Sequence, residues 1–151
     1  MNHKKTHIQA LVFERGGLSF AVPLSNVIKV IAAQYITPVA TTNQCLLGVI
    51  NFKGTFVPVV NINSKFGLED KPLSIEDNFI LTNQDGSTLA IIADSVAGIE
   101  ELDQSSLLCL EEKLPGITKA TLSGGHNGII IIYDANAIFS HQEIAQFTNI
   151  A

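Results

Sequence analysis

The chain has 151 residues, of which 46% are hydrophobic and 15% charged, and its formal net charge is −5. This length suits one ordinary domain, or two small interlocked halves, with a substantial core. Nucleic-acid binding is excluded, because the 9 Lys and Arg residues are spread thinly and form no basic stripe. A membrane-spanning helix is excluded as well, because the longest apolar run, Ile129 to Tyr133, falls far short of the roughly 20 residues that a span needs.

The N-terminal segment predicts a reducing compartment, which in turn decides how the cysteines are interpreted. Met1 to His7 is polar, and the apolar stretch of a secretory signal does not follow it. We therefore expect a cytoplasmic location without membrane insertion. Cys45 and Cys109 form no C-x-x-C pair, and a reducing compartment disfavours a disulfide between them. We expect both to be buried, unreactive thiols.

Strand signals dominate the first half of the chain. Apolar, β-branched runs predict strands over His7–Glu14, Leu18–Val22, Val27–Ala32, Leu46–Phe52 and Phe56–Ile62. Tight turns are predicted at Arg15-Gly16-Gly17 and Lys53-Gly54-Thr55, because glycine accepts a positive φ. Tyr35–Thr42 is expected to be an extended connection. Asn63–Leu68 is expected to form a helical turn ended by Gly67, and Glu69–Asp77 a polar linker.

The second half continues with strands. They are predicted over Asn78–Thr82, Thr88–Ala93, Val96–Leu102, Ile117–Leu122 and Gly128–Tyr133. The turns between them are placed at Asn83–Ser87, with its Asp85-Gly86 signal, and at Ser123–Asn127, while Asp103–Gly116 is expected to be loop or short helix. Weak helices are predicted over Ala135–Phe139 and Gln142–Phe147, with Asp134 and Ser140 as caps. Strands that recur every 8 to 12 residues or so are typical of barrels or a sandwich.

The residue patterns that catalysis or metal binding would need are missing. The histidines, His3, His7, His126 and His141, stand at no metal-ligand spacing. No G-x-S-x-G elbow, P-loop or dinucleotide fingerprint occurs. The glycine-rich run Gly124–Gly128 lies between two predicted strands rather than before a helix, which disfavours phosphate binding. We therefore expect no enzyme activity, no catalytic residue, no metal and no cofactor.

The carboxylates offer no better candidate for chemistry. Asp85 and Asp94 stand near strand ends, but a single carboxylate is weak evidence for acid–base catalysis. A cluster of acidic residues is expected to be a solvated face, and it comprises Glu100, Glu101, Asp103, Glu111 and Glu112.

The segment Gly48–Ile62, GVINFKGTFVPVVNI, carries the most information. Gly48 lets a strand begin or bend, and the amide of Asn51 is placed to hydrogen-bond the hairpin backbone. Lys53 and Gly54 form the exposed tip. Pro58 stands in a strand-like run, where its missing N–H restricts it to an edge or a bulge near the surface. The sequence thus predicts a β-hairpin that could serve as a docking element.

This segment resembles the signature of the CheW family of chemotaxis adaptor proteins, roughly G-V-x-N-x-R-G-x-x-V-P-V-x-D-L. The likeness extends over about residues 8 to 140, and it includes Leu11-Val12-Phe13, Phe66-Gly67-Leu68, Ile91 to Val96 and Ile129 to Asp134. The resemblance implies a mostly β fold, with two intertwined five-stranded SH3-like barrels around a shared hydrophobic core and short helices. It implies one CheW-like domain over residues 8–140, made of two barrel subdomains, and a C-terminal tail or short helix over 141–151.

The resemblance also implies a function. Family members are non-enzymatic adaptors that couple a chemoreceptor's cytoplasmic tip to the regulatory domain of a CheA-type histidine kinase in bacterial chemotaxis. It implies a monomer in solution and no cofactor. It assigns partner binding to the strand around Val27 and to the hairpin tip, with Val27, Ile28, Lys29, Asn51, Lys53 and Gly54 as the candidate residues.

Departures from the family pattern indicate a divergent member. Lys53 replaces the signature Arg and lacks its planar, bidentate geometry. Asn61 replaces the signature Asp, and Lys29 stands where an acidic residue is common. These departures leave open an adaptor of a pilus-motility or other accessory chemosensory pathway. A second alternative, from a different class, is a small-ligand-binding β-barrel sensor, which would need a cavity lined by apolar and a few polar residues.

Overall fold

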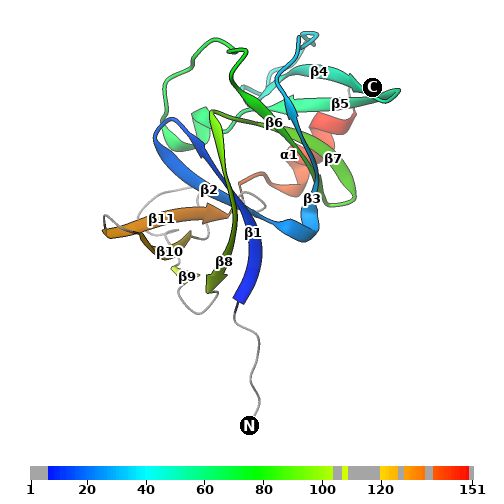
Figure 1. Ribbon diagram of the computed structural model, residues 1–151. Helices are drawn as coiled ribbons and strands as arrows, with labels where there is room; N and C mark the ends of the chain where they lie inside the picture. The colour runs from blue at the N-terminus through cyan, green and yellow to red at the C-terminus, as the bar shows by residue number, and fades with distance from the viewer. Residues whose placement is uncertain (1–6, 104–106, 109–119, 126–127, 135–137, 150–151) are drawn as a thin grey trace.

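The computed structural model describes residues 7–103, 107–108, 120–125, 128–134 and 138–149, which form two β-sheets (Figure 1). The first sheet has the strand order β8-β1-β2-β11-β10-β9. Its strands are β1 (His7–Arg15), β2 (Leu18–Pro23), β8 (Ser95–Asp103), β9 (Leu107–Leu108), β10 (Ala120–Gly125) and β11 (Gly128–Asp134). The second sheet has the order β3-β6-β7-β5-β4. Its strands are β3 (Val27–Ala32), β4 (Leu46–Phe52), β5 (Thr55–Val60), β6 (Asn78–Gln84) and β7 (Ser87–Ala93).

The two sheets are intertwined along the chain. The first sheet begins with β1 and β2, the chain then builds the whole second sheet, and β8 returns to pair with β1 (Figure 1). Neighbouring strands are antiparallel except for two parallel pairs, β2 with β11 and β5 with β7. The predicted fold of two SH3-like barrels is confirmed, and the two-residue β9 extends the first sheet to six strands.

Both faces of the inner strands are apolar because each sheet faces two cores. Along β6, Phe79 and Leu81 point into the interior of the second barrel, whereas Ile80 points into a core shared by both sheets. The first sheet contributes Phe13 and Phe20 to this shared core. On the other face of the first sheet, a smaller cluster comprises Ala10, Val12 and Ala21. Every residue of β7 from Leu89 to Ala93 is therefore buried, which explains the high apolar fraction of the sequence.

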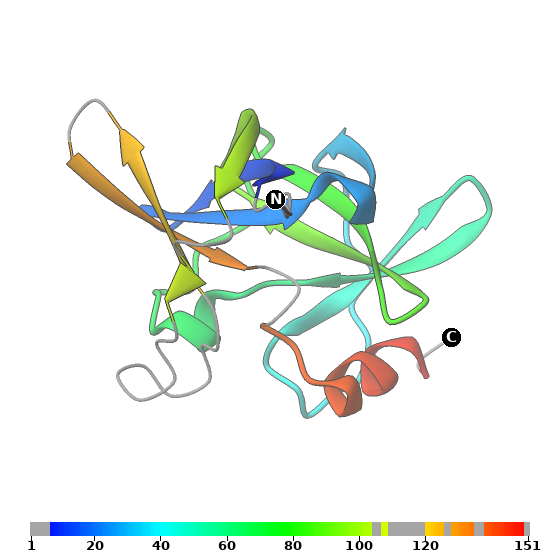
Figure 2. The same ribbon diagram turned by 90° about the horizontal axis from the view of Figure 1, so that it is seen from below.

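Short helices complete the fold. A 3₁₀ turn over Leu24–Asn26, which the sequence did not predict, precedes β3, and a second one over Asn63–Phe66 ends at Gly67 as predicted. The C-terminal helix α1 (His141–Thr148) has the predicted N-cap, Ser140, which forms a capping box with Glu143. Figure 2 shows α1 beside the strands of the second sheet, and its buried residues Ile144 and Phe147 belong to the shared core.

Several predicted boundaries were wrong in the second half. Leu107–Leu108 is a strand rather than loop or helix, and β10 continues through Gly125, into the predicted turn. Asp134 ends β11 instead of capping a helix, and Ile138 and Phe139 form bends. The other predictions for 104–106, 109–119, 126–127 and 135–137 lie outside the described residues, as do His3, His126 and Cys109.

Pro58 does not lie on an edge strand as predicted, because β5 lies between β4 and β7. It faces Val49, whose N–H and C=O both bond Thr37 on the other side, so the two residues form a non-hydrogen-bonded pair. The missing N–H of Pro58 thus points toward β7, where pairing begins only at Val59. No ladder bond is lost, and a proline is tolerated in an inner strand.

Cys45 is a buried free thiol, as predicted. Burial raises the pKa of this thiol, against the lowering effects of a contact with Ser64 and the charge of Lys65. The residue therefore packs as a small apolar group. Among the described residues, no helix is long and apolar enough to cross a membrane.

Candidate functional site

The hairpin tip between β4 and β5 is a tight two-residue turn. Lys53 and Gly54 both have a positive φ, of 51° and 85°, as in a type I′ turn, and Phe52 pairs with Thr55 across it. A positive φ is uncommon for lysine. The Asn51 side chain holds the turn, because its Oδ1 accepts a hydrogen bond of 2.8 Å from the N–H of Gly54. The predicted turn and the predicted role of the Asn51 amide are both confirmed.

The outer edge of β4 is covered by the extended segment that precedes it. The N–H and C=O of Thr37 bond the C=O and N–H of Val49, both at 2.9 Å. The neighbouring Gly48 allows this approach, because a Cβ at position 48 would stand 2.1 Å from the Thr37 carbonyl oxygen. Gly48 is therefore required by close backbone packing, and it anchors the base of the hairpin.

The edge strand β3 carries a β-bulge at Ile28. Val27 pairs with Thr82 and Lys29 pairs with Leu81, so Ile28 is the extra residue. Without the bulge, Val27 and Lys29 would point to the same face. With it, Val27 packs against the shared core, whereas Lys29 lies on the side of the second-barrel interior, as does its pairing partner Leu81. Ile28 itself is 51% exposed.

Phe52 connects the two groups of predicted partner-binding residues. Its ring packs against the interior core of the second barrel, and it is half-buried. The Nζ of Lys29 lies 5.8 Å from the ring centroid and the Nζ of Lys53 lies 5.3 Å from it, both within cation–π range. Strand β3 and the hairpin, at the two edges of the second sheet, thus meet at one aromatic ring. The sequence reading did not single out Phe52, and no local pattern marks it.

The structure therefore brings Lys29, Lys53, Gly54 and Asn51 into one exposed area around Phe52. We call this area, together with Ile28, the β3–hairpin surface. Val27 takes no part in it, because its side chain packs against the shared core. The area is preformed by backbone pairing and by the Asn51–Gly54 bond.

The lysine and arginine side chains that the structure describes fall into two groups. Arg15, Lys65 and Lys71 form ion pairs with carboxylates, at N···O distances of 2.8, 2.6 and 2.8 Å. Among the described side chains, Lys29 and Lys53 pair with no carboxylate. The two unpaired cations of this part of an acidic protein are thus the two that share the Phe52 ring.

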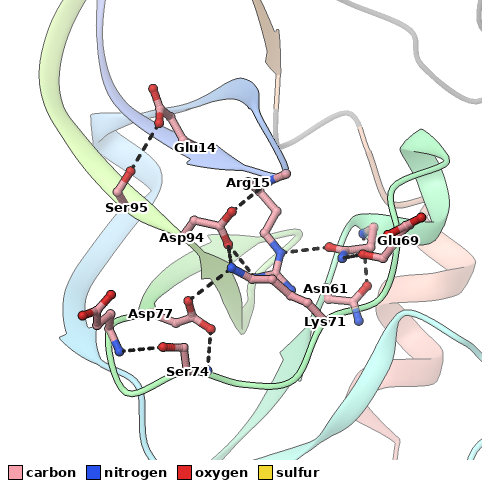
Figure 3. Close-up of polar contacts among 12 residues, drawn as sticks. Glu14, Arg15, Asn61, Glu69, Lys71, Ser74, Asp77, Asp94 and Ser95 are labelled. Carbon is pink, nitrogen blue, oxygen red and sulfur yellow. Dashed lines mark hydrogen bonds and ion pairs between the residues drawn. The ribbon is translucent and has the colours of Figure 1, made fainter.

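A separate polar network, shown in Figure 3, joins the two sheets. Arg15, the last residue of β1, is only 3% exposed. Its Nη1 donates to Asp94 at 2.8 Å, and its Nε donates to Asn63 Oδ1 at 2.9 Å. Lys71 and the N–H of Gly16 also contact the Asp94 carboxylate. The sequence reading missed this network, because Arg15 looked like a turn residue and its partners are distant in the sequence.

The environment of Asp94 assigns it a structural task. Partial burial raises the pKa of this carboxyl, but the hydrogen bonds from Lys71, Gly16 and Arg15 outweigh that effect and hold the pKa below its ordinary value. A carboxylate held in its charged form by three donors is a poor general base. The signature position Asn61 is also buried, and its Oδ1 accepts a hydrogen bond from the N–H of Asn63.

Within the described residues, neither a group of metal ligands nor the interior of the second barrel marks a small-ligand site. Within the described ranges, no group of three His, Cys, Asp or Glu residues could hold a metal ion. Apolar side chains fill the interior of the second barrel, and they comprise Ile50, Val57, Val59, Phe79, Leu81, Ala90 and Ile92. The β3–hairpin surface is therefore the candidate site in the described part of the chain.

Comparison with known proteins gives relatives along nearly the whole chain. The chain is 22% identical over 149 residues to the chemotaxis protein CheW of Treponema pallidum, and the aligned region covers 94% of this chain and 88% of the relative. It is 28% identical over 132 residues to the chemotaxis protein CheA of Bacillus subtilis, covering 87% of this chain and 19% of that protein.

The fold is matched as well. The crystal structure of the scaffolding protein TtCheW from Thermoanaerobacter tengcongensis superposes with a TM-score of 0.73 at 20% identity, covering 88% of this chain and 92% of that one. The sequence profile of the CheW-like domain matches residues 9–143. The chain therefore belongs to the CheW-like domain family.

Proposed function

We propose that this chain is a non-enzymatic adaptor that couples a chemoreceptor's cytoplasmic tip to the regulatory domain of a CheA-type histidine kinase. The observation that carries the proposal is the CheW-like match over residues 9–143, which includes the intact hairpin from Gly48 to Ile62. The similarity to a part of CheA supports a kinase partner, because a kinase that carries a domain of the same family offers a related surface for docking.

The proposed receptor contact is the β3–hairpin surface. Its candidate residues are Ile28, Lys29, Asn51, Lys53 and Gly54, with Val27 supporting the strand from below. Two features support this assignment. The tip is exposed, and the Asn51–Gly54 hydrogen bond restrains its turn, which reduces the ordering entropy lost on binding. Lys29 and Lys53 have no carboxylate partner among the described side chains, so they are free to bind one on another protein.

The proposed mechanism is a population shift. An adaptor with separate receptor and kinase contacts transmits a signal when the receptor's two states differ in their affinity for it. Because both barrels share one core, a change at the hairpin can reach the first sheet through packed side chains. We further propose a cytoplasmic monomer whose domain spans residues 8–140, with 141–151 as a C-terminal helix and tail.

The lysines at 29 and 53 also bear on which pathway uses the adaptor. The family pattern has an acidic residue where Lys29 stands and an Arg where Lys53 stands, whereas this surface has two cations. A receptor adapted to this surface would differ in charge from the usual one. An accessory chemosensory pathway is therefore the second candidate. A small-ligand sensor is not favoured, because side chains fill the second barrel.

Co-sedimentation tests the proposal. Receptor arrays, the cognate kinase and this chain are mixed and pelleted, and the kinase in the pellet is measured with and without the chain. The adaptor proposal expects the kinase to pellet only when the chain is present. If no candidate receptor and kinase pair gives a ternary complex, the proposal fails.

A further inference from the structure

The β3–hairpin surface places two unpaired cations beside one aromatic ring. The Nζ atoms of Lys29 and Lys53 lie 5.8 and 5.3 Å from the centroid of Phe52. Both side chains are exposed, and the net charge of the chain is −5. Two positive charges at one ring attract an anion more strongly than an uncharged group.

The backbone determines where both lysine side chains leave the chain. The bulge at Ile28 turns Lys29 toward the barrel interior, where the Phe52 ring lies. The positive φ of Lys53 and the Asn51–Gly54 hydrogen bond determine where the tip lysine leaves the chain. Phe52 packs against the barrel core and so cannot move away freely. Preorganised cations lose less entropy on binding than cations on mobile loops.

We propose that Lys29 and Lys53 form a clamp for one carboxylate side chain, an Asp or Glu, on the protein that docks at this surface. The carboxylate docks beside the Phe52 ring that both ammonium groups flank. This inference rests on the proposed function only in taking the receptor tip as that protein. We take the anion to be a protein side chain, because one carboxylate is enough to contact two ammonium groups. A polyanion such as a nucleic acid would need a continuous row of cations, and the few Lys and Arg residues of this chain are spread too thinly to form one.

The experiment measures the affinity of the full chain for a receptor cytoplasmic fragment at about 50 and about 300 mM salt, because contacts between exposed charges weaken as salt screens them. Lys29→Gln and Lys53→Gln should each weaken binding up to about fivefold at low salt. The double charge reversal, K29E with K53E, should weaken it by more than tenfold and should abolish most of the salt dependence. Circular dichroism should show unchanged thermal stability for all three.

The control is Gln142→Glu, which alters net charge by the same amount as Lys→Gln but lies on the exposed part of α1. Its affinity should equal that of the unaltered chain. An equal loss in the control would overturn the clamp in favour of a net-charge effect. A rescue completes the test: replacing one carboxylate of the receptor tip by lysine should restore binding to the K29E/K53E variant and to none of the others.

Failure of the clamp and failure of the proposed function are distinguishable. If the unaltered chain binds the receptor and the K29E/K53E variant binds equally well, only the clamp is overturned. If the unaltered chain binds no receptor, the proposed function fails first. Binding of the unaltered chain to vesicles containing about 30% anionic lipid, or self-association that the double variant abolishes, would replace the receptor carboxylate by another anion and would also overturn the proposal.

Discussion

Arg15 and Asp94 hold the two sheets together at the end of β1. The Arg15 Nη1 lies 2.8 Å from Asp94 Oδ1, although the two residues are 79 positions apart in the sequence. Arg15 also donates to Asn63, and Asp94 also accepts from the N–H of Gly16. This network is separate from the β3–hairpin surface, so the protein's stability and its partner binding can be altered independently.

Loss of Arg15 should destabilise the protein without removing the partner surface. Arg15→Met keeps much of the aliphatic volume but leaves Asn63 Oδ1 and one side of Asp94 without their donor. We expect unfolding to become easier by about 2 kcal/mol, as is typical for an unsatisfied buried group. Urea denaturation followed by circular dichroism measures this change. A variant as stable as the original chain would contradict the structural role of Arg15.

Two carboxylates, Asp94 of this network and Glu143 of helix α1, predict a loss of stability in acid. The pKa of Asp94 in the folded state is below the ordinary value of 3.8. The charged Asp94 therefore contributes its full stabilisation above pH 3.8, and this stabilisation is lost as the pH falls through the folded-state pKa. For Glu143, burial raises the pKa but the hydrogen bonds from Lys65, Ser140 and Asn43 outweigh it, so the lowered pKa acts in the same direction below 4.5. The free energy of unfolding should therefore decrease from pH 5 toward pH 3 or so.

Asp94→Asn is the matched test of that acid sensitivity. The variant should be less stable than the original chain at pH 7, and the gap should narrow as the pH falls. Denaturation curves at several pH values measure both quantities. A gap that stays constant with pH would mean that Asp94 contributes packing rather than charge.

Replacing each of two hairpin glycines by alanine should reduce the stability of the protein by a different amount. Gly48→Ala places a Cβ 2.1 Å from the Thr37 carbonyl oxygen and 2.8 Å from Ile36 Cγ2, so backbone must move, and we expect a loss of about 2 kcal/mol or more. Gly54→Ala meets no atom within 4 Å and bears only the strain of its φ of 85°, about 1 kcal/mol. Melting temperatures of the two variants rank these costs. The reverse order would contradict the role of the Thr37 contact.

Asn51 should matter through its oxygen. Asn51→Ala removes the acceptor for the N–H of Gly54 and should cost about 1 kcal/mol of stability. Asn51→Asp keeps the acceptor and serves as the control for the turn, while it adds a negative charge beside Lys53. The first variant should therefore lower the melting temperature, and the second should lower mainly receptor affinity. Equal effects of the two on stability would argue against the hydrogen bond.

Local features of the fold could be predicted from the sequence. Strands β3 and β4 have the predicted bounds, and the Lys53-Gly54 turn, the Asn51 bond and the Ser140 cap are all as expected. Each depends on neighbouring residues, because period-2 alternation, turn dipeptides and capping boxes are short-range patterns. The two-barrel architecture required the family resemblance, since the strand spacing alone also fits a sandwich.

Features that depend on distant residues could not be predicted. The approach of Lys29 to Phe52 needs the bulge at Ile28 and closure of the second sheet, neither of which leaves a local pattern. The Arg15–Asp94 pair joins the end of β1 to the residue that follows β7, and the whole second sheet lies between them in the sequence. Pro58 was predicted at an edge, because a proline lacks the N–H that an inner strand normally needs. The sequence does not show that pairing with β7 starts one residue later, at Val59.

Recruitment of the kinase to receptor arrays tests the central claim most directly. The amount of CheA-type kinase that sediments with receptor is measured against increasing concentrations of this chain, with K29E/K53E as the comparison. The account predicts a saturable rise in bound kinase with the unaltered chain and a marked shift to higher concentration with the variant. Kinase sedimentation that is independent of the chain at every concentration would contradict it.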